Sequence, residues 1–201
     1  MLIKTLPVGQ LETNCYVVTD EDSLDCAVID PGDESGTILD YLEDNRLHCR
    51  AVLLTHAHFD HVGAANALLE ATGARLYMCE KELELVKGGA SGRFTVPEDV
   101  KYYRDGDTVE VGGLRFEVME TPGHTPGGVT LRCGFTGDTL FRGSCGRTDF
   151  AGGDMRQELR SLKRIAELPG DYEVYPGHAE SSMLSIEREH NPYVRHALEK
   201  M

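Results

Sequence analysis

The sequence concentrates metal-binding side chains in one hexapeptide, His56-Ala57-His58-Phe59-Asp60-His61. Four of its six residues carry an imidazole or a carboxylate, which are good ligands for zinc, manganese or iron. On extended backbone, the spacing of His56 and His58 places both side chains on the same side. Asp60 and His61 lie further round the turn and can face a second ion. The pattern differs from the helical His-x-x-x-His zinc motif, and it predicts a site for more than one metal.

Three further segments share a local pattern with the hexapeptide, because each is a strand-like run that ends in a turn and then presents His or Asp. They are Thr121-Pro-Gly-His124, Thr136-Gly-Asp138 and Tyr175-Pro-Gly-His178. Ligand sites form beyond the ends of strands, so these segments are expected to converge on the hexapeptide. Two ions that share seven protein ligands need a bridging carboxylate, and Asp138 is the candidate. Mixed His and Asp ligation leaves room for water, which favours a catalytic over a structural site.

Other polar side chains are candidates for supporting roles. Asp30, in the segment Val-Ile-Asp-Pro-Gly, can orient a ligand histidine, and a simple turn former is an equal alternative. Basic side chains close to these segments can pair with a substrate carboxylate, and ordinary solvated or structural charge is the alternative for each. Arg147, for example, can instead pair with Asp149 or Asp154. The candidates are Arg142 and Arg147, just past Asp138, and Lys87 and Arg93 in a weakly patterned loop.

The remaining chain predicts strands and helices that can position these segments. β-rich or apolar runs favour strands, helical spacing of apolar residues favours helices, and Gly112-Gly113 favours a hairpin. The predicted strands are Asn14–Thr19, Asp25–Ile29, Ala51–Thr55, Arg75–Cys79, Thr108–Val111, Leu114–Met119, Val129–Cys133 and Glu173–Tyr175. The predicted helices are Asp33–Asn45, Val62–Thr72, one capped by Asp154, and a last one over Ser181–His190. Residues 87–99 are interpreted as a loop near the site. Two groups of strands, each followed by helices, indicate two packed sheets with helices outside.

Size and composition narrow the class of protein. The 201 residues fit one domain spanning 1–201. A net charge of −14 argues against nucleic acid or an anionic membrane as a partner. No apolar run approaches the ~18 residues of a membrane span, and the start lacks a signal-peptide pattern. The six cysteines form no C-x-x-C pair and are interpreted as reduced, mostly buried thiols of a cytoplasmic protein, with Cys145 as a packing residue.

The hexapeptide, together with Pro-Gly-His124, Thr-Gly-Asp138 and Pro-Gly-His178, resembles the metallo-β-lactamase superfamily in order and spacing over nearly the whole chain. The resemblance implies an α/β fold, a four-layer αββα sandwich with the metals at one edge of the sheets. It further implies two divalent ions, with zinc the first expectation and iron or manganese the alternatives. The implied ligands are His56, His58 and His124 for one ion, Asp60, His61 and His178 for the other, and Asp138 as the bridge. Asp60 and Asp138 are thereby also the implied catalytic carboxylates.

Within that superfamily, the segment from Phe135 to Phe150 is similar to glyoxalase II-like proteins. Pro-Gly-His178, followed by Glu187-Arg188 and Asn191-Pro192, is typical of their short, single-domain members. Hydroxyacylglutathione hydrolases split the thioester of a 2-hydroxyacyl glutathione, so the resemblance implies a metal-dependent thioesterase that acts on a small molecule. The two-domain members bind much of the glutathione through a C-terminal helical domain. This chain is too short to contain that domain, which leaves the thiol carrier open.

The residues favour a thioester for a chemical reason as well. The expected nucleophile is a hydroxide that bridges the metals, because metal binding lowers the pKa of water from 15.7 to about 7. Every motif histidine is used as a ligand, so none is left as a general acid. A thiol with a pKa of about 8.5 departs as thiolate without protonation, whereas an amine does not.

The nearest alternative is a persulfide dioxygenase. Such enzymes share the fold and a Cys-Gly-Arg-Thr-Asp-Phe segment like that from Cys145 to Phe150, but they use a single iron. A lactonase or a β-lactamase is less favoured, and a nuclease less still because of the charge. A metal-binding scaffold without activity has no positive support, since all seven ligand positions are filled.

Overall fold

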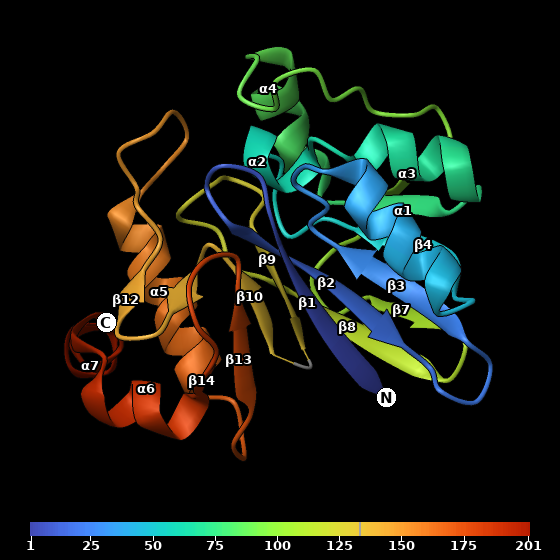
Figure 1. The fold of residues 1–201 in the computed structure, drawn as a ribbon. Coiled ribbons are helices and arrows are strands. Elements are labelled where there is room, and N and C mark those ends of the chain that lie inside the picture. The colour runs from blue at the N-terminus through green and yellow to red at the C-terminus, as the bar shows by residue number, and fades with distance from the viewer. Residues whose placement is uncertain (133) are drawn as a thin grey trace.

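The computed structural model describes residues 1–132 and 134–201, and they form two six-stranded sheets that pack face to face (Figure 1). The first sheet has, in spatial order, β1 (Leu2–Val8), β2 (Thr13–Thr19), β3 (Asp25–Ile29), β4 (His48–Leu53), β5 (Arg75–Met78) and β6 (Lys101–Tyr102). The second has β14 (Ser182–Met183), β13 (Glu173–Pro176), β10 (Phe135–Gly137), β9 (Val129–Arg132), β8 (Leu114–Glu120) and β7 (Thr108–Val111). A separate hairpin pairs β11 (Leu140–Phe141) with β12 (Ser144–Cys145).

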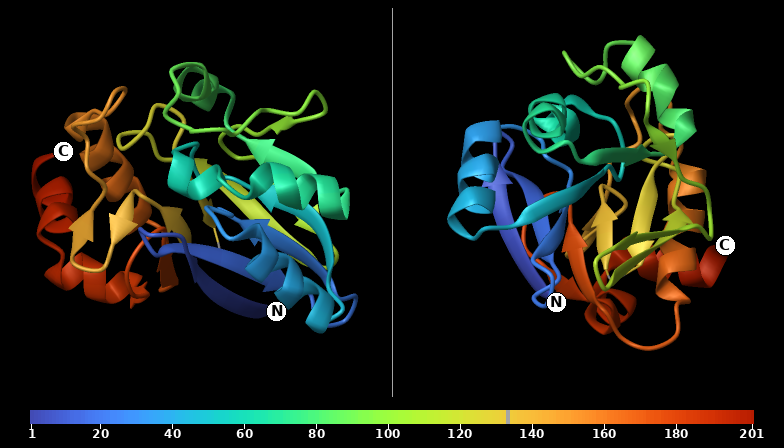
Figure 2. Two further views of the ribbon diagram at one scale, coloured as in Figure 1. Left: turned by 45° about the horizontal axis from the view of Figure 1, so that its top comes forward. Right: turned by 90° about the vertical axis from the view of Figure 1, so that its right-hand side faces the viewer.

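Helices cover the outer face of each sheet, and Figure 2 shows the same layers from two other sides. Beside the first sheet lie α1 (Ser35–Asp44), α2 (Phe59–Val62), α3 (Ala65–Thr72), the 3-10 helix η1 (Glu80–Glu82) and α4 (Leu83–Lys87). Beside the second lie α5 (Met155–Ala166), α6 (Leu184–His190) and α7 (Pro192–Lys200). The four-layer αββα sandwich expected from the sequence is therefore confirmed.

Side chains that alternate along the strands form the two apolar layers on either face of the first sheet. In β2, Tyr16 and Val18 point into the core between the two sheets, whereas Cys15 and Val17 point toward the helices. On successive strand residues the side chains alternate between faces, so a strand covered on both sides needs apolar side chains on both faces. All seven residues of β2 are buried. A third cluster, which includes Leu162 of α5, packs the outer helices against the second sheet.

The main departures from the predicted elements lie where turns and caps interrupt a helical pattern. The helix expected over Val62–Thr72 is wrong at its start, because α2 ends at Val62 and α3 begins at Ala65. The helix expected over Ser181–His190 begins only at Leu184, because Ser182 and Met183 form the short strand β14, and it is not the last helix. Asn191 and Pro192 begin α7, with the Asn191 side chain accepting hydrogen bonds from the next amides. The strand expected over Val129–Cys133 is β9 to Arg132, and residue 133 lies outside the described residues.

Two further sequence expectations concern the membrane and the thiols. Within residues 1–132 and 134–201, no helix is long and apolar enough to span a membrane.

Five cysteines in the same residues are free thiols, four of them buried and Cys145 partly exposed.

Candidate metal centre

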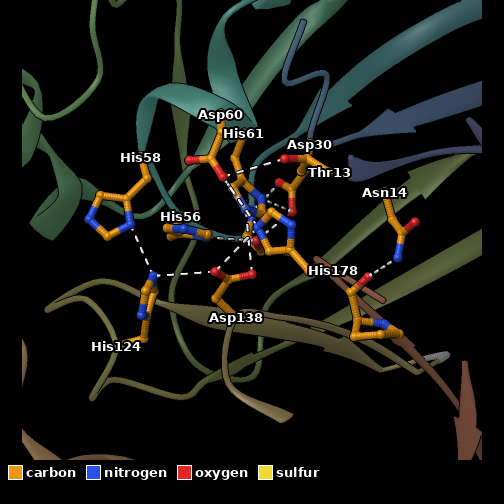
Figure 3. A network of polar contacts seen from close by, with 12 residues as sticks. Thr13, Asn14, Asp30, His56, His58, Asp60, His61, His124, Asp138 and His178 are labelled. Atoms are coloured by element: carbon orange, nitrogen blue, oxygen red, sulfur yellow. Dashed lines mark hydrogen bonds and ion pairs between the residues drawn. The ribbon is translucent and has the colours of Figure 1, made fainter. Parts of the chain in front are cut away.

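The predicted ligands lie beyond the carboxyl ends of strands from both sheets. In the first sheet, the parallel strands β3 and β4 end side by side, and the hexapeptide follows β4 after two residues. In the second sheet, His124 follows β8, Asp138 follows β10 directly, and His178 follows β13. Figure 3 shows their side chains converging on one point. Each sheet thus contributes part of the cluster, as the shared strand-turn pattern predicted.

One group combines His56, His58 and His124. A nitrogen atom of each imidazole lies within 4.8 Å of one in each of the others. His58 Nδ1 and His124 Nε2 are 3.0 Å apart, facing each other across the group. Three imidazoles arranged this way match the nitrogen donor set that zinc or iron takes in proteins.

A second group combines Asp60, His61 and His178 with the same limit of 4.8 Å between ligand atoms. Asp138 lies between the groups. Its Oδ1 is 3.4 Å from His61 Nε2, and its Oδ2 is 3.5 Å from His124 Nε2 (Figure 3). All seven predicted ligands are therefore brought together, in the two sets that the resemblance implied, with the carboxylate of Asp138 positioned to reach both.

Burial and neighbouring charge set the protonation of these groups. Burial lowers the pKa of His56 well below its ordinary value, and burial followed by the neighbouring His124 lowers the pKa of His58 to about 4. Both imidazoles are neutral at pH 7 and keep a lone pair for a metal. Burial raises the pKa of Asp60, but the hydrogen bond from His178 and the charge of the nearby His61 together outweigh it, so the pKa falls to about 2. Burial opposes protonation of His61, whereas Asp138 and Asp30 raise its pKa well above the ordinary value.

Unpaired polar atoms show that this donor set fits metal ions. His56 Nε2, His61 Nε2 and Asp138 Oδ1 are buried and have no hydrogen-bond partner among the described residues. Buried polar atoms are nearly always satisfied, so three unsatisfied ones in one cluster indicate a missing partner. Gly177, before His178, supports this, because a Cβ there would lie 2.2 Å from Asp138 Oδ1. The space around the carboxylate is kept free by the absence of a side chain, and two divalent ions are the fitting occupants.

Asp30 connects the end of β3 to the hexapeptide. Its Oδ1 accepts a hydrogen bond from the Thr55 amide at 2.7 Å, and its Oδ2 lies 3.0 Å from His61 Nδ1. Asp30 adopts a left-handed backbone conformation with φ 49°, which costs free energy for a residue with a side chain. The contact with His61 supports the predicted orienting role over the simple turn former, because it fixes which ring nitrogen faces the cluster.

Two further buried carboxylates hold the ligand segments, and the sequence reasoning missed both. Glu82 of η1 accepts hydrogen bonds from the amides of Ala57 and Gly127, each at 2.7 Å. Glu158 of α5 accepts one from the His124 amide at 2.8 Å, and burial raises its pKa to about 9. In a chain with 34 acidic residues, no spacing signal separates these two from solvated ones.

A cavity of about 790 Å³ opens onto the cluster, with Phe141 and Phe150 among its apolar walls. Arg147 lines it, stacked on Phe150 at 3.9 Å from the ring centre, and pairs with both carboxylate oxygens of Asp149. Arg142 is not among the lining residues, and its guanidinium pairs with Glu180 on the surface. Substrate contact by either arginine stays a prediction, and Arg147 has the better position for it.

Two more sequence candidates bear on this cavity. Cys145 lines it, and burial raises the pKa of its thiol to about 12. The segment 87–99 borders it through Ala90, as predicted for a loop near the site. Lys87 ends α4 and pairs with Glu84 at 2.7 Å, outside the lining.

Known proteins resemble this chain over almost its full length. The family profile described as the metallo-beta-lactamase superfamily matches residues 8–178. The hydroxyacylglutathione hydrolase GloC of Haemophilus influenzae is 32% identical over 96% of this chain and 98% of that protein. The BLEG-1 B3 metallo-beta-lactamase superimposes with a TM-score of 0.87 at 32% identity, covering 96% of this chain and 99% of the other. TTHA1623, in a di-iron-bound form, superimposes with a TM-score of 0.84 at 36% identity, covering 94% and 99%.

Proposed function

Because this chain belongs to the metallo-beta-lactamase superfamily, we propose that it hydrolyses a thioester, and that its substrate is a 2-hydroxyacyl glutathione or a close analogue. The coarser assignment, a metal-dependent hydrolase with a His and Asp metal site, follows from the family and from the clusters described above. The name of the Haemophilus relative supports the finer one. The ions we propose are two divalent metals held by the two groups, with Asp138 between them.

The observation that carries the proposal is the set of titratable side chains in the cavity. Apart from five of the proposed ligands, the described residues that line it offer only Cys145 and Arg147 as titratable side chains. A thiol with a pKa of about 12 and a guanidinium are both too weak as acids to protonate a leaving group at pH 7. A leaving amine needs such a proton, whereas a leaving thiolate does not. The cavity therefore favours thioesters over amides.

The residues around the clusters have separate tasks in this reaction. When bound, the metals supply Lewis acidity and lower the pKa of water toward 7. Asp60, ionised because its pKa is about 2, adds negative charge to the second group and holds His178, whose Nε2 is 3.2 Å from Asp60 Oδ2. Phe141 and Phe150 exclude water from the acyl group. Arg147 is placed to attract a carboxylate on the substrate.

A substrate panel tests the proposal. Metal-loaded protein is assayed with 2-hydroxypropanoyl glutathione, acetyl coenzyme A, a lactone and a β-lactam. The expected result is a kcat/KM for a thioester at least a hundredfold above those for the lactone and the β-lactam. Faster turnover of either of these would refute the thioester assignment. Asp138→Asn is expected to abolish turnover while the thermal unfolding transition of the metal-free protein is retained.

The single-iron persulfide dioxygenase is tested in the same preparation. The second ligand group and the position of Asp138 support two ions rather than one. Metal analysis is expected to give about two ions per chain, and glutathione persulfide is expected to cause no oxygen uptake. One iron per chain together with oxygen uptake would establish the dioxygenase instead.

A further inference from the structure

A second cavity of about 650 Å³ adjoins the cavity over the metal centre. The two share Leu11, Phe59 and Asp60 as lining residues, so together they form one continuous surface. The second cavity extends away from Arg147, between the turn that joins β1 to β2, the start of α3, and the segment from Ser91 to Phe94. A substrate whose reacting carbonyl lies over the metal centre can therefore extend in two directions.

The wall formed by residues 90–95 is fixed to the hexapeptide and to α3. The Phe59 amide donates a hydrogen bond to the Ala90 carbonyl at 2.9 Å, and the Ser91 hydroxyl donates one to the Ala57 carbonyl. Asn66 of α3 exchanges two hydrogen bonds with the backbone of Thr95. The loop whose role the sequence left open is thus held against the metal centre at both ends of this segment, and the backbone that carries Arg93 is held with it.

The charged side chains of the second cavity have opposite signs. Arg93 and Asp33 both line it, and both are exposed. Within residues 1–132 and 134–201, the Arg93 side chain forms no ion pair or hydrogen bond. Arg147, in contrast, is paired with Asp149. Among the residues that the structure describes, the Asp33 side chain accepts a hydrogen bond only from the adjacent Glu34 amide, through Oδ1. Apart from Asp60, a proposed metal ligand that also lines it, the second cavity offers one cation and one anion, which suit a zwitterion. The carboxylate of Asp33 disfavours a ligand that carries only phosphates.

We propose that this second cavity binds the zwitterionic amino-acid end of a peptidic thiol carrier, with Arg93 binding its carboxylate and Asp33 its ammonium group. This inference rests on the proposed thioesterase function and names the part of the chain that recognises the leaving group. The apolar side chains of Leu11 and Phe59 would contact the thiol segment between the two cavities.

Binding of a non-hydrolysable probe tests this subsite without relying on turnover. S-methylglutathione is titrated calorimetrically into metal-loaded wild type, Arg93→Ala and Ala67→Phe. Ala67 is an exposed residue of α3 that lines the second cavity, so a phenylalanine there would occupy part of its volume. Both variants are expected to weaken binding about tenfold. For Arg93→Ala this is the affinity lost with one charge-assisted hydrogen bond at a partly exposed site. The matched control is Arg195→Ala, an exposed arginine of α7, which is expected to bind as wild type does.

A truncated probe identifies which part of the ligand Arg93 contacts. N-acetyl-S-methylcysteinylglycine lacks the γ-glutamyl end, so its affinity is expected to be the same for wild type and Arg93→Ala. The subsite is refuted if wild type does not bind S-methylglutathione, or if Arg93→Ala and Ala67→Phe bind it unchanged. Tighter binding of S-methyl coenzyme A, with the same dependence on Arg93, would overturn the zwitterion in favour of phosphates.

Kinetics separate this inference from the proposed function. With 2-hydroxypropanoyl glutathione, Arg93→Ala is expected to raise KM about tenfold and to leave kcat within twofold. If wild type binds S-methylglutathione through Arg93 but hydrolyses no thioester, the subsite stands and the thioesterase assignment fails. If thioesters are hydrolysed and their KM does not depend on Arg93, the function stands and the subsite fails.

Discussion

Replacing the buried carboxylate of Glu82 tests whether the metal centre depends on a residue that holds the ligand segments by their backbone amides. Glu82 is 1% exposed, and each of its oxygens accepts one backbone hydrogen bond at 2.7 Å. One bond comes from Ala57, between His56 and His58, and the other from Gly127, which follows His124 in the chain. Glu82 therefore joins the segments that carry all three ligands of the first group, and we regard it as a positioning residue.

Glu82→Gln keeps the shape of the side chain but leaves it a single acceptor oxygen. One of the two amides then faces an NH₂ group and loses its partner. An unsatisfied buried amide costs roughly 1–3 kcal/mol. Taking about 2 kcal/mol and a Tm shift of roughly 2–4 °C per kcal/mol for a chain of this size, we expect the Tm of the metal-free protein to fall by about 4–8 °C. Metal affinity is expected to fall roughly 10- to 100-fold, as for other groups that orient ligands.

Calorimetry of the metal-free protein and chelator competition for zinc measure the two effects separately. The matched control is Glu80→Gln, in the same 3-10 helix but exposed, which is expected to shift the Tm by less than about 2 °C. If Glu82→Gln leaves both the Tm and the metal affinity unchanged, the reasoning is wrong. A lower Tm with unchanged metal affinity would reduce Glu82 to a structural residue.

Four further predictions concern protonation, the cavity and the metals. The pKa of about 9 for buried Glu158 lies above its ordinary value, so the folded protein holds one more proton than the unfolded chain between about pH 5 and 9. The free energy of unfolding of the metal-free protein should therefore fall as the pH rises through this window, by up to about 1.4 kcal/mol per pH unit. Urea unfolding should show a smaller fall for Glu158→Gln. Cys145, with a pKa of about 12, should stay a thiol at pH 8 and resist iodoacetamide, and Cys145→Ala should keep kcat within twofold. Arg147→Ala should raise KM for a substrate with a carboxylate about tenfold and leave that for an uncharged acyl thioester unchanged, whereas equal effects on both would indicate a structural role. Chelation should lower the Tm of the loaded protein by several degrees, because ions that bind only the folded state stabilise it by mass action.

The sequence predicted best those features that follow from local spacing. The seven proposed ligands could be found because each follows a strand-like run and a turn, and strands of a packed sheet bring such positions to one edge. The helix predicted over Ser181–His190 was expected to be the last, although Asn191-Pro192 begins another, since Asn caps a helix and Pro fits its first turn. Asn191 directly follows the last residue of α6 and also caps α7, and the packing of Val194 and Ala197 against α5 and its neighbours stabilises this second helix. The β1 strand was missed because it is an edge strand with mostly exposed side chains.

The roles of the buried acidic residues at the site could not be predicted for a common physical reason. Their hydrogen-bond partners define these roles, and those partners are distant in the sequence. Asp30, Glu82 and Glu158 come from a strand end and two helices, and each accepts hydrogen bonds from the backbone of a ligand segment. Burying a carboxylate without partners is costly, and the amides of the ligand segments offset this cost for Asp30 and Glu82. Glu158 avoids it by staying protonated at neutral pH, because burial raises its pKa to about 9. The metal centre is therefore held by two kinds of contact: side chains that face the ions, and an outer set of carboxylates that fix the backbone between them. Since the ligands come from both sheets, ions bound there also link the two halves of the sandwich, and metal affinity becomes part of the stability of the fold.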